Sequence, residues 1–187
     1  MELELLTERL RITPYAADDV DFAIEMWTDP AVVEYICEVL TEEVVRQDMP
    51  NVIKRGGNGG IGLWCVADRR TGEKLGESYL WPLPVDEDDT DFSLIVMGQM
   101  PDAEIEIGYF LKPSAWGRGY ATEICKRMLQ FAFQDVALDE VVASVDEGNV
   151  ASKKVLEKCG LLSSGQTRCY GKDSPIYRIS RDQWNAL

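Results

Sequence analysis

The 187-residue sequence contains no histidine and no Cys-x-x-Cys pair. These absences exclude the usual zinc sites and every catalytic triad that needs an imidazole, so acid–base chemistry must come from carboxylates, tyrosines, serines or the substrate itself. The sequence also lacks an apolar run long enough for a membrane span, and residues 1–11 lack the basic-then-apolar order of a signal peptide. We therefore expect a cytoplasmic protein that has no membrane partner and requires no metal.

Basic residues are scarce, since 19 Lys and Arg stand against 33 Asp and Glu, for a formal net charge of −14. This balance argues against a nucleic-acid partner, because a phosphate backbone would be repelled. It favours cationic small molecules or basic peptides as partners, although solubility alone would also account for it. The charge therefore restricts the class of partner without identifying one.

The chain is long enough to bury a core, and we expect one domain over residues 1–187. Its cysteines are odd in number, widely spaced and mostly on apolar faces: Cys37, Cys65, Cys125, Cys159 and Cys169. That distribution predicts reduced core thiols and not a disulfide framework.

Hydrophobic periodicity predicts a mixed α/β sheet. Strands are expected at 10–13, 61–67, 73–81, 104–111, 140–145, 164–170 and 175–180. Helices are expected to begin at the cap Asp18, at Thr41 with Glu42 and Glu43 in the first turn, after Gly119, and at 150–159. Residues 82–102 hold three prolines, the acidic run 86–91 and an apolar stretch at 92–97, which we interpret as an insertion with one extra strand. Its acidic run is either a solvated surface loop or a substrate lid or dimer contact.

One stretch joins the strand at 104–111 to the following helix: Trp116-Gly117-Arg118-Gly119-Tyr120-Ala121-Thr122. Two glycines one residue apart at a helix start let the backbone bend sharply and leave its first amide N–H groups uncovered. The helix dipole adds partial positive charge, and Arg118 and Thr122 add further donors. The stretch therefore predicts a phosphate or pyrophosphate site, although an isolated Gly-x-Gly is equally often a plain tight connection.

Neither a Walker loop nor a dinucleotide-binding loop matches this stretch. It resembles the acyl-CoA pyrophosphate loop of the GNAT superfamily of N-acetyltransferases, Gln/Arg-x-x-Gly-x-Gly/Ala, from Trp116 to Ala121. Tryptophan at the first position is usual in the branch that resembles ribosomal-protein N-terminal acetyltransferases, where Trp-Gly-x-Gly-Tyr-Ala-Thr-Glu recurs. The resemblance implies a mixed, mostly antiparallel sheet with splayed central strands flanked by helices. It also implies acetyl-CoA as co-substrate, held by Phe110, Leu111 and all seven residues of the stretch.

A second pattern, Asn149-x-x-Ser152-x-x-x-Leu156-Glu157-x-x-Gly160-Leu161, resembles the other cofactor-side motif of the family. Ser152 shares the inward helix stripe with Leu156, where such a serine would ordinarily bond back to a carbonyl one turn earlier. Many family members carry a tyrosine at the position of Leu156, thought to protonate the leaving thiolate, and this chain departs from them. The resemblance implies that Ser152 lies near the cofactor sulfur and that Asn149 hydrogen-bonds the pantetheine arm.

Amine acetylation requires a base, because an alkylamine with a pKa near 10 is protonated at pH 7. Glu104 and Glu106 lie on the strand before the loop, on one face with Phe110, and a carboxylate acting through water would suffice. We favour Glu106, since it is nearer the point where cofactor and substrate would meet. The alternative is a strand edge that carries solvent-facing carboxylates.

These features predict an enzyme that transfers acetyl from acetyl-CoA to a primary amine by direct attack in a ternary complex, without an acyl-enzyme. The acceptor is a cationic small molecule, such as a polyamine or an aminoglycoside, or a protein N-terminus, and the protein is a monomer or homodimer. Trp27, Tyr35, Trp81 and the acidic insertion are candidates for the acceptor side. The alternative is a non-catalytic CoA-binding or sensing module, because the tyrosine is missing.

Overall fold

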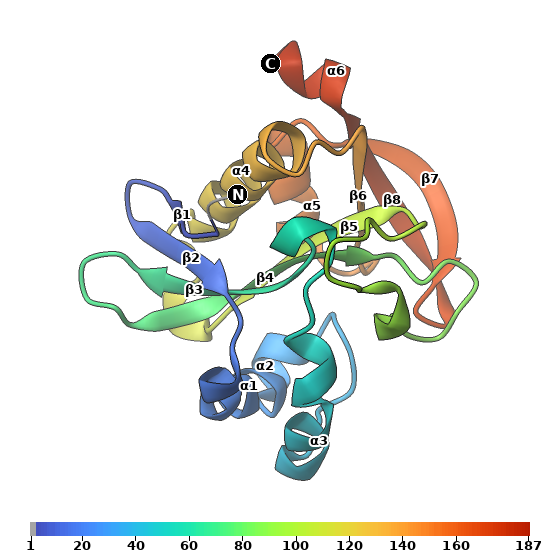
Figure 1. The fold of residues 1–187 in the computed structure, drawn as a ribbon. Coiled ribbons are helices and arrows are strands. Elements are labelled where there is room, and N and C mark those ends of the chain that lie inside the picture. Colours follow the sequence, from blue (N-terminus) through green and yellow to red (C-terminus); the bar gives the residue numbers. More distant parts are fainter. Residues whose placement is uncertain (1–2) are drawn as a thin grey trace.

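Successive apolar side chains of the central strands point to opposite faces of the sheet, so both faces are apolar. In the computed structural model, which describes residues 3–187, β3 (Gly62–Asp68) directs Trp64 to one core and Leu63 to the other. Each face therefore needs helical cover (Figure 1). The first face is covered by α4 (Tyr120–Gln134) and α5 (Val150–Lys158), and the second by α1 (Val20–Trp27) and α3 (Glu42–Val52).

The strands of the described chain follow the order β1 (Leu5–Leu6), β2 (Leu10–Pro14), β3, β4 (Lys74–Pro82), β5 (Ile105–Leu111), β6 (Glu140–Ser144), β8 (Lys172–Ser180) and β7 (Leu162–Cys169). All neighbours are antiparallel except β5 and β6. β5 pairs with β4 along its whole length, from Ile105 to Leu111, but with β6 only where Glu106 lies opposite Val142. Beyond Glu106 the two strands separate, which confirms the predicted mixed, mostly antiparallel sheet with splayed central strands.

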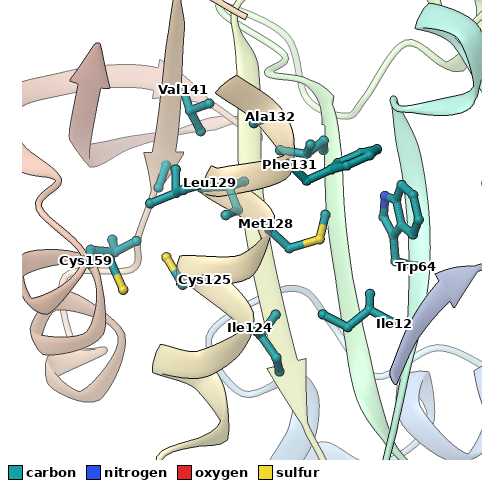
Figure 2. Close-up of a cluster of buried hydrophobic side chains, with 14 of the residues drawn as sticks. Ile12, Trp64, Ile124, Cys125, Met128, Leu129, Phe131, Ala132, Val141 and Cys159 are labelled. Carbon is teal, nitrogen blue, oxygen red and sulfur yellow. The ribbon is translucent and has the colours of Figure 1, made fainter. Parts of the chain in front are cut away.

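α4 anchors the first core through side chains at helical spacing. Figure 2 shows Ile124, Met128 and Phe131 facing the sheet residues Ile12 and Trp64. The rings of Trp64 and Phe131 meet edge to face, with centroids 5.2 Å apart. All five cysteines are free and four are buried, as predicted for core thiols, whereas Cys37 is exposed. None of the described helices is both long enough and apolar enough to cross a membrane.

The remaining elements are short: α2 (Pro30–Val33), α6 (Arg181–Asn185) and the 3-10 turns η1 (Ala17–Asp19), η2 (Gly57–Gly59), η3 (Phe92–Leu94) and η4 (Pro113–Ala115). The predicted cap at Asp18 is wrong, because η1 delays α1 to Val20 and the side chain of Asp19 accepts a hydrogen bond from the Ala16 amide at 2.8 Å. The predicted helix start at Thr41 is confirmed, since α3 begins at Glu42 and the Thr41 hydroxyl caps it by accepting a hydrogen bond from the Val44 amide.

The extra strand predicted at 92–97 is also wrong. Residues 92–94 form η3 instead, and Asp91 caps it by accepting a hydrogen bond from the Ser93 amide at 2.8 Å. Phe92 and Ile95 turn inward and pack in the second core. A spacing of three brings side chains to one side of a 3-10 turn, whereas a strand would place them on opposite faces. Packing therefore decided between two structures that this short apolar stretch allows.

Candidate active site

A cavity of about 280 Å³ lies where β5 and β6 separate. At one end it reaches Asn149, Ser152 and Leu156 of α5, and at the other it extends beneath α1 and α3. Its volume is near the lower limit for small-molecule sites. The cavity therefore joins the second motif of the sequence to a compartment on the second face of the sheet.

Glu106 lies at the point of strand separation and is fully buried. Its Oε1 accepts hydrogen bonds from the amide of Ser144 at 2.7 Å and from the Ser144 hydroxyl. Its Oε2 accepts from the hydroxyl of Tyr170 at 2.7 Å and, more weakly, from that of Tyr79 at 3.4 Å. Burial raises the pKa of Glu106, and these hydrogen bonds oppose the shift. The carboxyl is thus held behind three hydroxyl groups that themselves line the cavity.

Glu104 occupies a different environment. Its carboxylate forms a bidentate pair with Arg178, at 2.5 and 3.1 Å, and the same guanidinium also binds Glu140 at 2.8 Å. Its side chain is 39% exposed and lies outside the cavity lining. The sequence predicts both carboxylates on one face of the strand, but their surroundings differ. Of the two, only Glu106 is connected to the cavity by hydrogen bonds.

The sequence did not identify Tyr170 or Ser144, which join Glu106 to the cavity. Tyr170 follows β7, 64 residues beyond Glu106, so no local pattern could have paired them. One signal was available in β5, where Gly108 interrupts an otherwise bulky strand. A Cβ at Gly108 would lie 2.0 Å from the Tyr79 ring, so the glycine makes room for that ring beside Glu106.

At the α5 end, Asn149 caps the helix by accepting a hydrogen bond from the Ser152 amide at 2.9 Å. The hydroxyl of Ser152 lies 3.2 Å from that of Tyr109 on β5. Burial raises the pKa of Tyr109 well above its ordinary value, so the phenol stays protonated. A second hydroxyl that sequence analysis missed therefore lies beside Ser152, and both residues line the cavity together with Leu156.

The glycine stretch has the geometry expected of it. Gly117 and Gly119 take positive φ angles of 70° and 79°, and no side chain caps α4 at Gly119. A Cβ at Gly117 would meet nothing within 4 Å, so this side of the loop is open. Trp116 fixes the entry to the loop by donating from Nε1 to the Leu111 carbonyl at 2.8 Å. The first amides of α4, including those of Ala121 and Thr122, therefore lack side-chain cover from Gly119.

Arg9, which lies just before β2, supports the loop. Its Nη1 donates to the Arg118 carbonyl at 2.9 Å, and its Nη2 pairs with Glu123 at 2.5 Å. The guanidinium of Arg9 lies 4.5 Å above the buried Tyr120 ring, and that of Arg118 lies 4.8 Å from the same ring. A residue more than a hundred positions away thus holds the loop, and sequence spacing gave no sign of it.

Phe110 and Leu111 are both buried but point to opposite faces. Phe110 meets Trp27 edge to face at 5.0 Å and lines the cavity, whereas Leu111 packs in the α4 core. Because β6 leaves β5 beyond Glu106, the backbone edge of this part of β5 has no strand partner on that side. Such an edge accepts an extended ligand that carries amide groups.

The compartment on the second face is lined by Trp27, Tyr35 and Trp81, the three aromatics that the sequence suggested for the acceptor side. Asp89, Thr90 and Phe92 of the insertion line it as well. Part of the acidic run therefore belongs to the cavity wall, although Asp86 and Asp88 are exposed and lie outside the lining.

A model of the acetyltransferase (GNAT) domain matches residues 9–162, a span that includes Glu106, the glycine stretch and α5. The open glycine loop at the start of α4 and the separation of β5 from β6 therefore lie in a domain of a known class of transferase. The chain is a member of the GNAT family of acetyl-CoA-dependent acetyltransferases.

Among related proteins, the uncharacterised YkkB of Bacillus subtilis is 29% identical over 178 residues, which cover 93% of this chain and 94% of YkkB. The FsC-acetyl coenzyme A-N(2)-transacetylase of Aspergillus fumigatus is 27% identical over 192 residues, covering 96% and 77% of the two chains. The solved aminoglycoside acetyltransferase AAC(6')-Ib, in complex with coenzyme A and kanamycin, aligns over 95% of this chain and 98% of its own at a TM-score of 0.74. At 14% identity, this last likeness shows a shared fold.

Proposed function

We propose that this acetyltransferase transfers the acetyl group of acetyl-CoA to a primary amine by direct attack, and that Glu106 is the base. The observation that carries the proposal is the position of Glu106, a buried carboxyl at the one position where β5 is paired with β6 in the described chain, joined to the cavity by Tyr170 and Ser144. Two candidate nucleophiles of the cavity wall argue against an acyl-enzyme: partial desolvation and the nearby Asp89 and Glu38 raise the pKa of the Cys37 thiol, and the Ser152 hydroxyl lies against Tyr109 and not against a base.

The residues of the open loop fit the co-substrate. The N–H groups at the start of α4 and the backbone of Gly117 and Gly119 would hold the pyrophosphate, with Arg118 and Thr122 close by. The pantetheine arm carries amides, which suit the unpaired edge of β5 at Phe110 and Leu111 and the side chain of Asn149. Acetyl-CoA supplies the activated acetyl group, and the cavity leads from α5 towards Glu106.

Proton transfer follows the hydrogen bonds around Glu106. The ammonium substrate loses one proton before attack, to the hydroxyl of Tyr170, whose own proton moves to Glu106 Oε2. The amine nitrogen then bonds to the acetyl carbon, the carbon–sulfur bond breaks, and the nitrogen loses a second proton. One of the two protons ends on the CoA sulfur and the other leaves to solvent. The raised pKa of Glu106 brings the carboxyl nearer to the pKa of the amine, which favours the first transfer.

We further propose that Ser152 and Tyr109 together assist the departing thiolate. The family tyrosine at the position of Leu156 is absent, but the Tyr109 phenol reaches the same end of the cavity from β5 and lies 3.2 Å from the Ser152 hydroxyl. A protonated phenol can donate to a developing thiolate, either directly or through the serine. The sequence alone suggested a non-catalytic module because the family tyrosine is missing. Tyr109 could take the role of that tyrosine, so its absence gives this alternative less support.

The test measures release of the CoA thiol from acetyl-CoA in the presence of primary amines, with binding of acetyl-CoA followed separately. Amine-dependent release supports the enzyme. Binding of acetyl-CoA without any amine-dependent release would support the CoA-binding or sensing module instead. The glycine stretch resembles the ribosomal-protein branch only in the loop that would bind the cofactor. Because that loop does not contact the acceptor, the resemblance does not identify the acceptor.

A further inference from the structure

The acceptor half of the cavity is lined mainly by carbon. Side chains of α1, α3 and their neighbours form this wall: Ala23, Leu40, Val45, Met49, Val52 and Leu63. Most of these residues belong to the buried core of the second face or pack against it. A hydroxyl or amide of the substrate placed against this wall would lose its water without gaining a partner. The substrate body that fits here is therefore apolar.

Aromatic rings close two further sides of the same compartment. Tyr79 stacks on Trp81 with ring centroids 4.0 Å apart and planes 22° from parallel, and Trp81 meets Phe92 edge to face at 5.6 Å. On the α1 side, Trp27 is held by a hydrogen bond from Nε1 to the buried Glu77 at 3.1 Å. Fixed π faces bind either a flat hydrocarbon or an ammonium ion.

Two carboxylates complete the compartment. Asp48 is half-buried and Asp89 is exposed, and both line the cavity. Within the described chain neither forms an ion pair with a lysine or arginine, whereas Asp146, also at the cavity, is neutralised by Lys172 at 2.7 Å. Negative charge therefore remains on the acceptor side, where a cation entering from solvent would meet it first.

From the carbon wall, the rings and the two unpaired carboxylates we propose that the acceptor is a small primary amine with one positive charge and an aromatic or branched hydrocarbon body. This inference rests on the proposed acetyl transfer and narrows its substrate. The carboxylates attract the ammonium group, and the hydrocarbon body fills the space beneath α1 and α3. The amine nitrogen is then directed to the end of the compartment where Tyr170 and Ser144 lead to Glu106.

The same wall disfavours the other acceptors. An aminoglycoside carries many hydroxyls and several charges, which the carbon surface cannot satisfy. A polypeptide N-terminus needs partners for its own backbone groups, but β4 is paired on both sides, with β3 and with β5, over the cavity floor. A polyamine would leave further ammonium groups against apolar side chains.

The test compares acetylation of five amines by the full chain: 2-phenylethylamine, ethanolamine, spermidine, kanamycin and a hexapeptide with a free N-terminus. The first two share the aminoethyl group and differ only in phenyl against hydroxyl. We expect kcat/KM for 2-phenylethylamine to exceed that for ethanolamine by roughly tenfold to a hundredfold, the gain from burying one aromatic ring. We expect it to exceed those for the other three amines as well.

Matched variants localise the effect. Phe92→Ala should lower kcat/KM for 2-phenylethylamine about tenfold, leave that for ethanolamine nearly unchanged and leave the KM for acetyl-CoA unaltered. Leu94→Ala, in the same turn but exposed and outside the lining, should leave all of these values unchanged. Asp89→Asn should raise the KM of the amine severalfold at low salt, and Asp88→Asn, from the same acidic run but outside the lining, should not.

A higher kcat/KM for ethanolamine, spermidine, kanamycin or the peptide would overturn the inference and leave acetyl transfer intact. Equal responses of Phe92→Ala and Leu94→Ala would also overturn it, because the wall would then not contact the substrate. Bound acetyl-CoA with no CoA release for any of the five amines would contradict the proposed function itself, and the inference with it.

Discussion

At the scale of single residues, Glu106 shows how burial separates two similar side chains. Glu104 and Glu106 are two positions apart, yet one is paired with Arg178 in contact with solvent and the other is fully buried beneath three hydroxyl groups. A strand's alternation predicts that they share a face, but it does not predict which of them meets a cation from another strand. That choice depends on Arg178, which β8 brings alongside from more than seventy residues away.

We expect Glu106→Gln to lower kcat by about a hundredfold or more, because the amine loses its base while the side chain keeps its size. The pKa of Glu106 is raised by burial, so wild-type activity should rise with pH through a value above that of an ordinary glutamate. This limb should disappear from the variant, so the loss should be greatest above the pKa of Glu106, where the wild-type carboxylate is ionised and can accept the proton. Steady-state kinetics from pH 5 to 9 measure the effect, and the affinity for acetyl-CoA should not change.

Glu104→Gln is the matched control, since it alters a neighbouring carboxylate of the same strand. It should lose the Arg178 pair and keep nearly wild-type kinetics. The opposite result, normal kinetics in Glu106→Gln and a large loss in Glu104→Gln, would transfer the role of base to Glu104. Loss in neither variant would mean that solvent accepts the proton.

Ser152→Ala and Tyr109→Phe should each lower kcat roughly tenfold to a hundredfold, because CoA thiol is itself a fair leaving group and needs modest help. If the two hydroxyls act as one unit across their 3.2 Å contact, the double variant should lose little more than either single variant. Single-turnover rates measured over a range of pH test this. An unchanged kcat and pH profile in both single variants would assign the pair a structural role, and a raised KM for acetyl-CoA at constant kcat would assign it to cofactor positioning.

At the scale of elements, local signals predicted most boundaries and failed where long-range packing decided. The strands β3 and β4, the helix start at Thr41 and the helix that follows Gly119 are all present, because turns and helix caps depend on adjacent residues. The apolar stretch after Asp91 predicts a strand, but a short apolar run does not distinguish a strand from a turn. Its outcome depended on contacts of Phe92 and Ile95 with the second core, which no local pattern contains.

The glycine stretch makes a prediction for the loop as a whole. Acetyl-CoA at about a hundredfold excess over Kd should stabilise the protein by about 2.7 kcal/mol, a rise in Tm of roughly 5 to 10 °C for a chain of this size. Gly119→Val should abolish this rise, because a β-branched side chain at a φ of 79° strains the turn and obstructs the phosphates. Thermal scans with and without acetyl-CoA measure it.

Gly98→Val provides the control, because Gly98 also has a φ of 79° and open space around its Cβ position but lies in the insertion. It should lower Tm by a similar backbone strain and retain the full rise with acetyl-CoA. If the rise in Tm with acetyl-CoA is still present in Gly119→Val, the pyrophosphate does not bind at this loop.

At the scale of the whole molecule, the family resemblance predicted the splayed sheet, whereas the residue pattern alone predicted only a mixed α/β class. Hydrophobic periodicity fixes which faces are buried but not where two parallel strands separate, since that depends on how few hydrogen bonds β6 forms with β5. The single-domain boundary over residues 1–187 and the cytoplasmic location stay predictions. The acceptor side was the least predictable part, because α1, α3, the insertion and β7 come together only in the folded chain.

Glu77 links the folded molecule as a whole to pH. It is fully buried in β4 and accepts hydrogen bonds from Tyr15 at 2.6 Å and Trp27 at 3.1 Å, with the Asp19–Lys74 pair nearby. Burial raises the pKa of Glu77 from 4.5 to about 8; Asp19 adds to this shift, while Tyr15, Trp27 and Lys74 oppose it. In the folded protein the carboxyl therefore holds a proton that the unfolded chain has released above pH 4.5.

This difference makes stability fall with rising pH. Since the folded state binds the extra proton, the contribution of Glu77 is fully present below pH about 4.5 and is lost as pH passes about 8. Glu106, whose pKa is also raised, acts in the same direction, whereas Asp146 and Glu123, whose pKa values are lowered, lose their contribution at acid pH.

We expect Glu77→Gln, which keeps the size and an acceptor oxygen but cannot ionise, to flatten the decline in the free energy of unfolding between pH 5 and 8. The decline removed should be on the order of a few kcal/mol. Urea unfolding at pH 5, 6.5 and 8 measures it, with Glu73→Gln, an exposed glutamate just before β4, as the control that should follow the wild type. Two results would contradict this prediction: a wild-type free energy of unfolding that rises from pH 5 to 8, or an equal decline in Glu77→Gln. Either would mean that Glu77 is ionised in the folded protein. The buried carboxylate would then be stabilised by Lys74 and the Tyr15 hydroxyl.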